Sequence, residues 1–155
     1  MTGTSLANNA AREGTLVNNT SNLYMDAILS GFVTVGAAAA TGNCYVLLSS
    51  SDATTVSYPA TGSNASIVVP VANLGALTLG QIVPGTALVF LYTIGTMGVA
   101  ATTAVGFENL SVAQAFGGNL PPKWAPVLVN CQGQSFDATA GHTVINYNGV
   151  TYTTA

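Results

Sequence analysis

The sequence predicts an all-β protein, folded as an antiparallel β-sandwich of the jelly-roll kind or a related Greek key. Three observations indicate this class. The 155 residues include 17 glycines and 6 prolines, turn signals recur about every dozen residues, and no long stretch spaces its apolar residues with the period of a helix. The length fits one domain with its own core, and we expect residues 15–155 to form it.

Residues 1–14 are expected to form an extended N-terminal arm. They are mostly small and polar, with too few large apolar side chains to pack by themselves. Such an arm would become ordered only against another molecule. It has neither the basic start nor the apolar run of a secretory signal, so we expect synthesis in the cytoplasm.

The first long strand is predicted over residues 22–35, where apolar residues occupy every second position. The odd-numbered residues of this stretch would face the core. The even-numbered positions include Tyr24, Ile28 and Phe32, so the opposite face is also rich in large apolar side chains. Two explanations stay open: both faces are covered within one subunit, or the even face is a contact between subunits.

Further strands are expected over residues 44–50, 66–71, 87–94, 104–110, 124–131 and 143–153. Long crossings as well as tight turns join these segments, which favours two stacked antiparallel sheets. Near the C-terminus, the dipeptide Asn148-Gly149 suits a two-residue type I′ turn, so this region is predicted to be a β-hairpin.

Charged residues are rare in this chain. Two basic and five acidic residues give a net charge of −3, whereas an ordinary domain has about a quarter of its residues charged. The seven are Arg12, Glu13, Asp26, Asp52, Glu108, Lys123 and Asp137. Uncharged polar side chains can be covered by another protein without the desolvation penalty of a buried ion. We therefore expect a component of a larger assembly, and no basic surface that could bind nucleic acid.

No catalytic, cofactor or metal site is predicted. The single histidine, His142, has Asp137 as the only acidic residue close in sequence, and no nucleophile is arranged beside them. Cys44 and Cys131 have no metal-site spacing, so buried thiols near strand ends are expected, with a disulfide as the alternative. The apolar run over residues 86–107 is broken by glycines and threonines, so we do not expect a membrane span.

Trp124 is the only tryptophan of the chain. Packing in the core is one expectation. The other follows from Pro126, which cannot donate to a sheet ladder and indicates an edge or a bulge near the start of this strand. Trp124 would then lie at the rim of the sandwich and join Tyr24, Ile28 and Phe32 in a subunit interface.

Two segments resemble a known group of proteins: NNTSNLYMDAILSG (18–31) and SVAQAFGGNLPPKWAPVLVNCQG (111–133). With the polar N-terminal arm and a final Tyr-bearing strand, they resemble small structural proteins encoded beside the major capsid protein of tailed bacteriophages, of the capsid cement, decoration or head-fibre type. The resemblance implies a jelly roll, a place on the outer capsid surface of the virion, and the major capsid protein as partner. In such a protein we expect the arm to contact the capsid through Leu6, Arg12 and Glu13.

The leading hypothesis is therefore a capsid cement protein, a homo-oligomer with a trimer favoured over a dimer. It would bind across neighbouring major capsid subunits and stabilise the expanded shell. An arm that becomes ordered on docking would distinguish the mature surface from the immature one. Two alternatives stay open: a tail-tube, adaptor or fibre-base component of the same virion, and a carbohydrate-binding sandwich that stacks sugars on Trp124 or Tyr58.

Overall fold

The computed structural model describes residues 3–51, 66–68 and 86–152. In chain order their strands are β1 (Ala10–Glu13), β2 (Val17–Asn18), β3 (Asp26–Thr34), β4 (Cys44–Ser51), β5 (Ser66–Val68), β6 (Thr86–Ile94), β7 (Ala104–Ser111), β8 (Lys123–Asn130) and β9 (Val144–Val150). Two helices of four residues each, α1 (Asn19–Asn22) and α2 (Val112–Ala115), complete the described elements.

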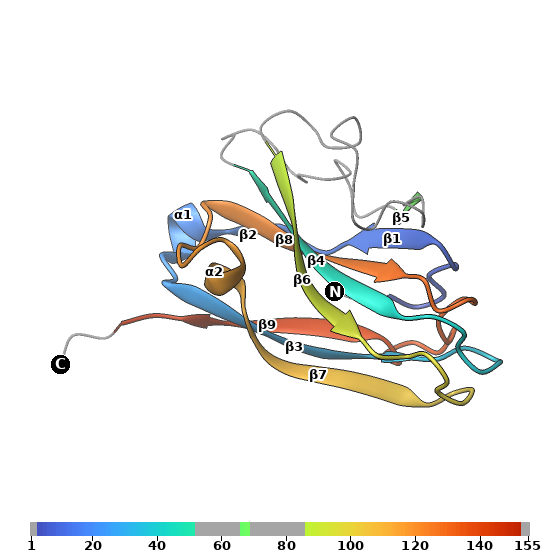
Figure 1. Ribbon diagram of the computed structural model, residues 1–155. Helices are drawn as coiled ribbons and strands as arrows, with labels where there is room; N and C mark the ends of the chain where they lie inside the picture. The colour runs from blue at the N-terminus through green and yellow to red at the C-terminus, as the bar shows by residue number, and fades with distance from the viewer. Residues whose placement is uncertain (1–2, 52–65, 69–85, 153–155) are drawn as a thin grey trace.

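The strands form two sheets that lie face to face (Figure 1). The larger sheet has the order β5-β1-β8-β4-β6, with β2 also paired to β8, and the smaller sheet has the order β7-β3-β9. Every strand pair is antiparallel. The prediction of an all-β antiparallel sandwich is therefore confirmed, whereas the jelly-roll connectivity stays a prediction.

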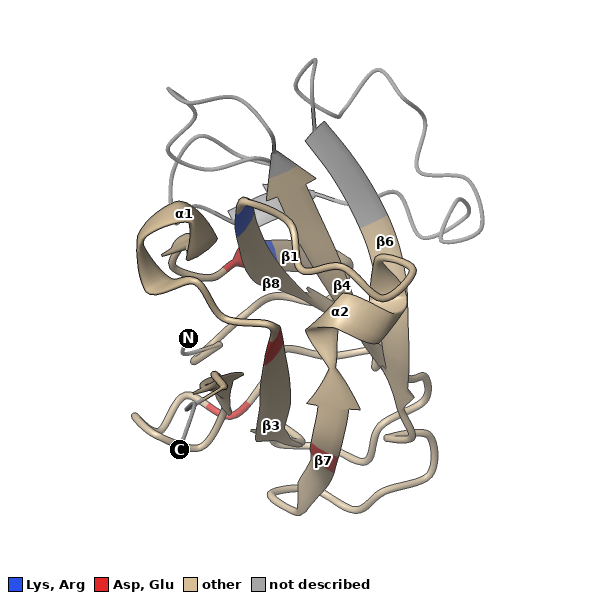
Figure 2. Ribbon diagram, turned by 90° about the vertical axis from the view of Figure 1, so that its left-hand side faces the viewer, with Lys and Arg blue, Asp and Glu red and all other residues tan. Residues whose placement is uncertain are grey.

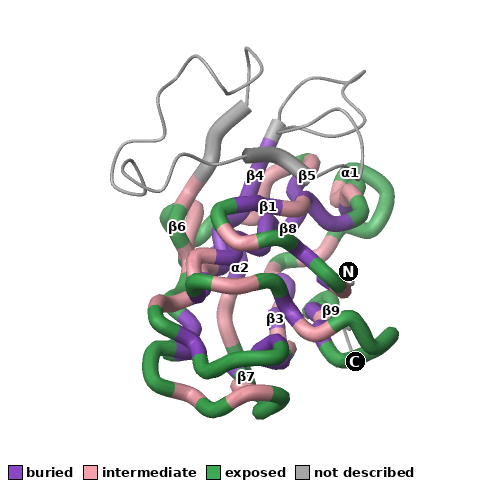
Figure 3. The backbone as a smooth tube through the Cα atoms, turned by 90° about the vertical axis from the view of Figure 1, so that its right-hand side faces the viewer, coloured by how far each residue is buried: buried purple, intermediate pink, exposed green. Residues whose placement is uncertain are grey.

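The core lies between the two sheets. The odd-numbered residues Ala27, Leu29 and Val33 of β3 are fully buried, as their period-2 spacing predicts. Leu48 and Leu128 of the larger sheet join the same cluster. Burying each large aliphatic side chain contributes about 1.5–3 kcal/mol, so this layer holds the sheets together. Figure 3 shows the buried stretches inside the stack of strands and the exposed ones on the loops and along parts of β7 and β9.

The N-terminal segment belongs to the larger sheet, so the prediction of a free arm is wrong for residues 3–14. β1 lies between β5 and β8 and pairs with both. Leu6 is buried, and Glu13 is fully buried with the Ser49 hydroxyl donating to its carboxylate at 2.5 Å. The segment has few large apolar side chains, but strands on both sides satisfy its main-chain hydrogen bonds.

β8 is a central strand although it contains a proline. β1 pairs with residues 127–130 and β2 pairs with residues 123–124, which leaves an interruption opposite Pro126. There the carbonyl oxygen of Pro126 accepts from the Gly14 N–H at 2.8 Å, and no ladder needs the missing N–H. The break that the proline indicates therefore lies in the neighbouring strand. Trp124 is fully buried in the core rather than at the rim.

The predicted C-terminal hairpin is wrong, because Asn148 and Gly149 lie inside β9. Seven consecutive residues of β9 pair with β3 without a register shift. Gly149 faces the ring of Tyr24, and a Cβ atom at this position would lie 2.4 Å from a ring carbon. The glycine therefore makes room for an aromatic ring within a strand, instead of supplying the positive φ of a tight turn.

Candidate functional site

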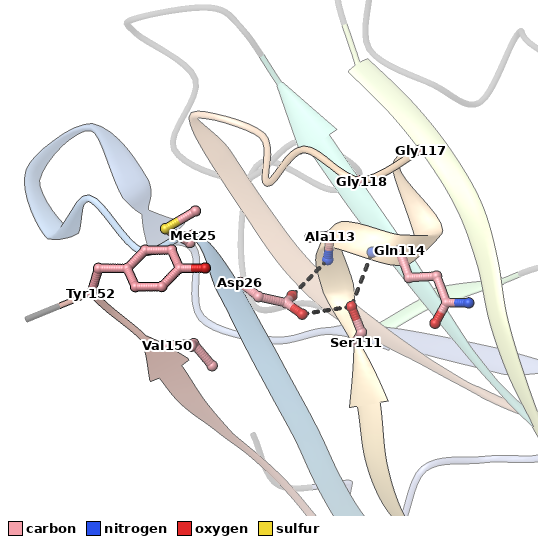
Figure 4. A pocket seen from close by; sticks show the side chains of 9 residues that line it. All are labelled: Met25, Asp26, Ser111, Ala113, Gln114, Gly117, Gly118, Val150 and Tyr152. Carbon is pink, nitrogen blue, oxygen red and sulfur yellow. Dashed lines mark hydrogen bonds between the residues drawn. The ribbon is translucent and has the colours of Figure 1, made fainter.

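An open groove lies where β3, β7 and the C-terminal end of β9 meet α2 (Figure 4). Its volume is about 540 Å³. It is lined by Met25, Asp26, Ser111, Ala113, Gln114, Gly117, Gly118, Val150 and Tyr152. These residues come from three segments that are distant in sequence. The first two lie within the segments that carry the family resemblance, and the third is the end of the Tyr-bearing strand.

Asp26 fixes the floor of the groove. Its carboxylate accepts hydrogen bonds from the Ser111 hydroxyl at 2.6 Å, from the Ala113 N–H at 2.8 Å and from the Ala27 N–H at 2.7 Å. Ser111 caps α2 by accepting from the Gln114 N–H at 3.0 Å. These charge-assisted bonds hold α2 against β3, so the carboxylate is engaged by the protein itself.

Exposed apolar side chains border this groove. The exposed fractions are 52% for Met25, 43% for Val150 and 81% for Tyr152. Leu23, two residues before Met25, is 74% exposed and has a φ of 53°, a left-handed conformation that is uncommon for leucine. Contiguous exposed apolar groups of this kind mark interaction surfaces.

Charge is sparse around the groove and over the rest of the described surface. Figure 2 shows single charged residues on β3, β7, β8 and the loop before β9, and the adjacent Arg12 and Glu13 on β1. Neither of the two basic residues, Arg12 and Lys123, lines the groove. A partner that covers this face therefore meets polar and apolar groups, with little unpaired charge to desolvate.

The four residues predicted for a subunit interface do not share one surface. Ile28 and Phe32 lie on the outer face of β3, half-buried and 36% exposed respectively. Tyr24 and Trp124 pack instead on the core side, where the ring of Tyr147 lies 6.5 Å from that of Tyr24 and 5.3 Å from that of Trp124. The buried Trp124 is therefore wrong as an interface residue, and Tyr24 is a half-buried part of the aromatic cluster.

The residues predicted to contact the capsid also lie within the body of the subunit. Leu6 is 1% exposed, and its carbonyl oxygen accepts from the Asn130 side chain at 2.8 Å. Glu13 is 0% exposed. Both predictions are wrong, because Leu6 packs in the core before β1 begins and Glu13 belongs to an internal strand of the sheet. Arg12 is half-buried and donates to the carbonyl oxygen of Thr4 at 3.3 Å.

His142 and Asp137 form a surface pair, with Nδ1 of His142 lying 3.0 Å from the Asp137 carboxylate. Hydrogen bonds from Thr139, with a smaller contribution from His142, hold the pKa of Asp137 below its usual range. The Thr139 N–H bond is 2.7 Å long, so this carboxylate organises a turn. In the part of the chain that is described, no group of three or more His, Cys, Asp or Glu side chains could hold a metal ion.

Both cysteines are free thiols. Cys44 is fully buried, and burial raises its pKa to about 11. Burial also raises the pKa of the half-buried Cys131. Cys44 pairs with Asn130 across the sheet, and successive residues of extended chain point to opposite faces. The two sulfur atoms are therefore directed away from each other.

Fold and groove together define a sparsely charged antiparallel β-sandwich with an apolar-rimmed surface groove. Comparisons with known protein families, with curated proteins and with solved structures return no match. Within the ranges that the structure covers, no helix is long and apolar enough to span a bilayer.

The groove could not be found from sequence patterns alone, because it is assembled from three distant segments. The alternation of apolar residues predicted that Leu23 and Met25 face the core, which is wrong because β3 begins only at Asp26 and both residues before it are exposed. The exposed Tyr152 has no signature in that alternation. One sequence signal does point to it: Ser111 precedes a short helical turn, where serine is a favoured N-cap.

Proposed function

We propose that this protein is a capsid cement or decoration protein of a tailed bacteriophage. It is a virion structural protein that lies on the outer capsid surface, binds across neighbouring major capsid subunits and stabilises the expanded shell. The observation that carries this proposal is the apolar-rimmed groove on a surface with few charges. Exposed apolar area of this kind favours a protein partner. Two segments that form the groove resemble cement proteins, which indicates the class of protein proposed here.

The groove suits a protein loop that inserts an apolar side chain. Met25, Val150 and Tyr152 offer apolar surface, and burying it against a partner is favourable by about 25 cal/mol per Å². The exposed amide of Gln114 can donate and accept hydrogen bonds at the rim. Asp26 already accepts three hydrogen bonds, so its carboxylate stays hydrogen-bonded when a partner closes the groove.

Stabilisation of the shell follows from mass action. A protein that binds only the expanded lattice shifts the equilibrium toward that lattice, by an amount set by its differential affinity. Because residues 3–14 are part of the folded sheet, this discrimination comes from rigid surfaces. A groove that contacts two neighbouring shell subunits fits only the spacing that they have after expansion.

The alternative is a tail-tube, adaptor or fibre-base role in the same virion. The number of copies per virion distinguishes this role from that of a cement protein. The carbohydrate-binding alternative has less support, since Trp124 is fully buried and cannot stack on a sugar. Tyr58, the other proposed stacking residue, lies outside the described residues. Two basic residues in the whole chain also favour a protein over a nucleic acid as the partner.

The first experiment counts copies of this chain per virion against the major capsid protein by quantitative mass spectrometry. A ratio near one, or a simple lattice fraction of it, supports a cement protein. A handful of copies per particle would overturn the cement assignment in favour of the tail or portal, and absence from the virion would overturn both.

The second experiment tests the groove on expanded shells stripped of this protein. Met25→Glu places a charge at the groove, and its matched control Met97→Glu changes the same side chain, 64% exposed, in the loop after β6. Sedimentation should show binding weakened at least about tenfold for Met25→Glu and unchanged for Met97→Glu. Equal binding by both variants would contradict the assignment of the groove as the contact.

A further inference from the structure

Among the described strands that lie at a sheet edge, β2, β5, β6 and β7 are protected against pairing with another chain, β2 because it has only two residues. β5 is only three residues long. β6 contains an extra residue opposite residues 46–47 of its partner β4. β7 contains an extra residue opposite residues 29–31 of its partner β3. Such bulges twist an edge away from a second strand. β7 also carries Glu108, which is exposed.

The C-terminal half of β9, residues 147–150, shows none of these protections. The seven residues of β9 pair with β3 without a register shift, and the strand's sequence VINYNGV contains neither a charged residue nor a proline. The side chains of Tyr147 and Val150 are 40% and 43% exposed. A straight, uncharged edge of this kind is a template for another strand.

The hydrogen bonds around β9 identify the groups that face outward. The Val150 carbonyl oxygen accepts from the Met25 N–H on the β3 side at 2.8 Å. Because successive residues alternate, the main-chain groups of Tyr147, Gly149 and Thr151 face the opposite side. Among the described residues, none donates to or accepts from these groups there. At the start of the strand the Gly3 N–H already occupies the Thr143 carbonyl oxygen at 3.1 Å.

We propose that this edge pairs with the β9 edge of a second copy of the chain, antiparallel about a two-fold axis at Gly149. The register is set by the outward groups: Tyr147 bonds to Thr151 of the partner subunit, and Gly149 bonds to Gly149 of the partner subunit. The two smaller sheets then form one continuous sheet across the axis. This is an isologous contact, in which the same surface serves both subunits.

A second copy fits this edge because the strand is compatible with itself. A two-fold axis brings identical residues close together, and like charges there would repel. Residues 143–152 contain no charge. At the axis itself stands a glycine, the residue that lets two backbones approach closely. On the outer face Asn148 lies opposite Val150 of the partner subunit, so no large side chain meets its own copy.

The inference concerns the homo-oligomer that the sequence analysis expects, and it does not depend on shell binding. A two-fold axis gives a dimer, or a larger assembly built from dimers, in place of the trimer that the sequence favoured. Tyr147 and Val150 become covered in this arrangement.

The test measures the mass of the full chain in solution by sedimentation velocity over a range of concentrations. Thr151→Pro removes an outward N–H that no described residue uses, and Thr151→Ala keeps it as the control. Asn148→Lys places like charges beside the axis, and Ala104→Lys makes the matched change at an exposed position on the opposite edge. We expect a dimer whose dissociation constant rises at least about tenfold in the first variant of each pair and is unchanged in the controls.

A wild-type chain that stays monomeric, or a mass that fits a trimer, would overturn the inference. It would also fail if Thr151→Pro and Thr151→Ala associated equally well. A monomer that binds expanded shells, and loses that binding on Thr151→Pro, would assign the edge to a shell strand instead of a second copy. That last result would leave the proposed function standing, so the two failures can be told apart.

Discussion

Replacing Gly149 with alanine should destabilise the protein through a single neighbour, the ring of Tyr24. The new Cβ atom would lie 2.4 Å from a ring carbon, well inside the roughly 3.5–4.0 Å of a favourable carbon contact. The ring must move away from Gly149, which disturbs its edge contact with Tyr147. Overpacking of this kind costs about 1–3 kcal/mol, so the free energy of unfolding should fall by that amount.

The same substitution should have the opposite effect once the ring is absent. In a Tyr24→Ala background the added methyl group meets no aromatic carbon, and alanine is favoured over glycine in a strand by about 0.5–1 kcal/mol. The two effects of Gly149→Ala should therefore differ by at least about 1.5 kcal/mol, a coupling that a double-mutant cycle resolves.

Urea unfolding followed by the fluorescence of the single, buried Trp124 measures all four variants. The cycle is best run in a Thr151→Pro background, so that self-association does not contribute. If Asn148-Gly149 formed a type I′ turn instead, alanine would be disfavoured by its positive φ whatever residue stood at position 24. Equal losses with and without the Tyr24 ring would therefore refute the assignment of Gly149 to a strand.

Three further predictions concern polar groups. Asp26→Ala should lower the free energy of unfolding by about 2–4 kcal/mol, since three donors lose a charged acceptor, and urea titration should show Asp26→Asn to be milder. Folding lowers the pKa of Asp137, so the ionised carboxylate stabilises the folded protein above about pH 4 and stops doing so as the pH falls through the folded pKa. Acid unfolding curves of wild type and Asp137→Asn should therefore differ above the folded pKa and coincide below it. Because burial raises the pKa of Cys44 to about 11, the folded protein at pH 8 should expose only the half-buried Cys131 to a thiol reagent, and rapid reaction of both thiols would contradict the fold around Cys44.

Period-2 alternation was sufficient to predict the strands that carry the core. In β3 the odd-numbered Leu29 and Val33 are buried as expected, while Phe32 on the even face is partly exposed. This pattern is informative because one face of the strand is covered by the other sheet while the opposite face is not. It failed for β1, which is only four residues long and is held by main-chain bonds to two strands more than by its own side chains.

Local turn chemistry misled the prediction at two places for the same physical reason. Asn148-Gly149 suits a tight turn and Pro126 suits an edge, yet both lie within long strand pairings. In each case the tertiary structure decides the outcome. The Tyr24 ring needs a glycine opposite it, and the interruption between β1 and β2 leaves no ladder partner for Pro126 to satisfy. The groove could not be predicted from the sequence for a related reason, since its residues meet only when β3, β7 and β9 are assembled.

The position of β1 also bears on how the chain folds during synthesis. β1 pairs with β8, more than a hundred residues later in the chain, and contacts of such long sequence separation close slowly. The larger sheet therefore stays open at its centre until β8 has left the ribosome. Until that moment β1 can pair with β5, but its side that faces β8 lacks a partner strand. The residues of β1 are therefore made long before those of β8, and they are fully covered only after β8 is in place.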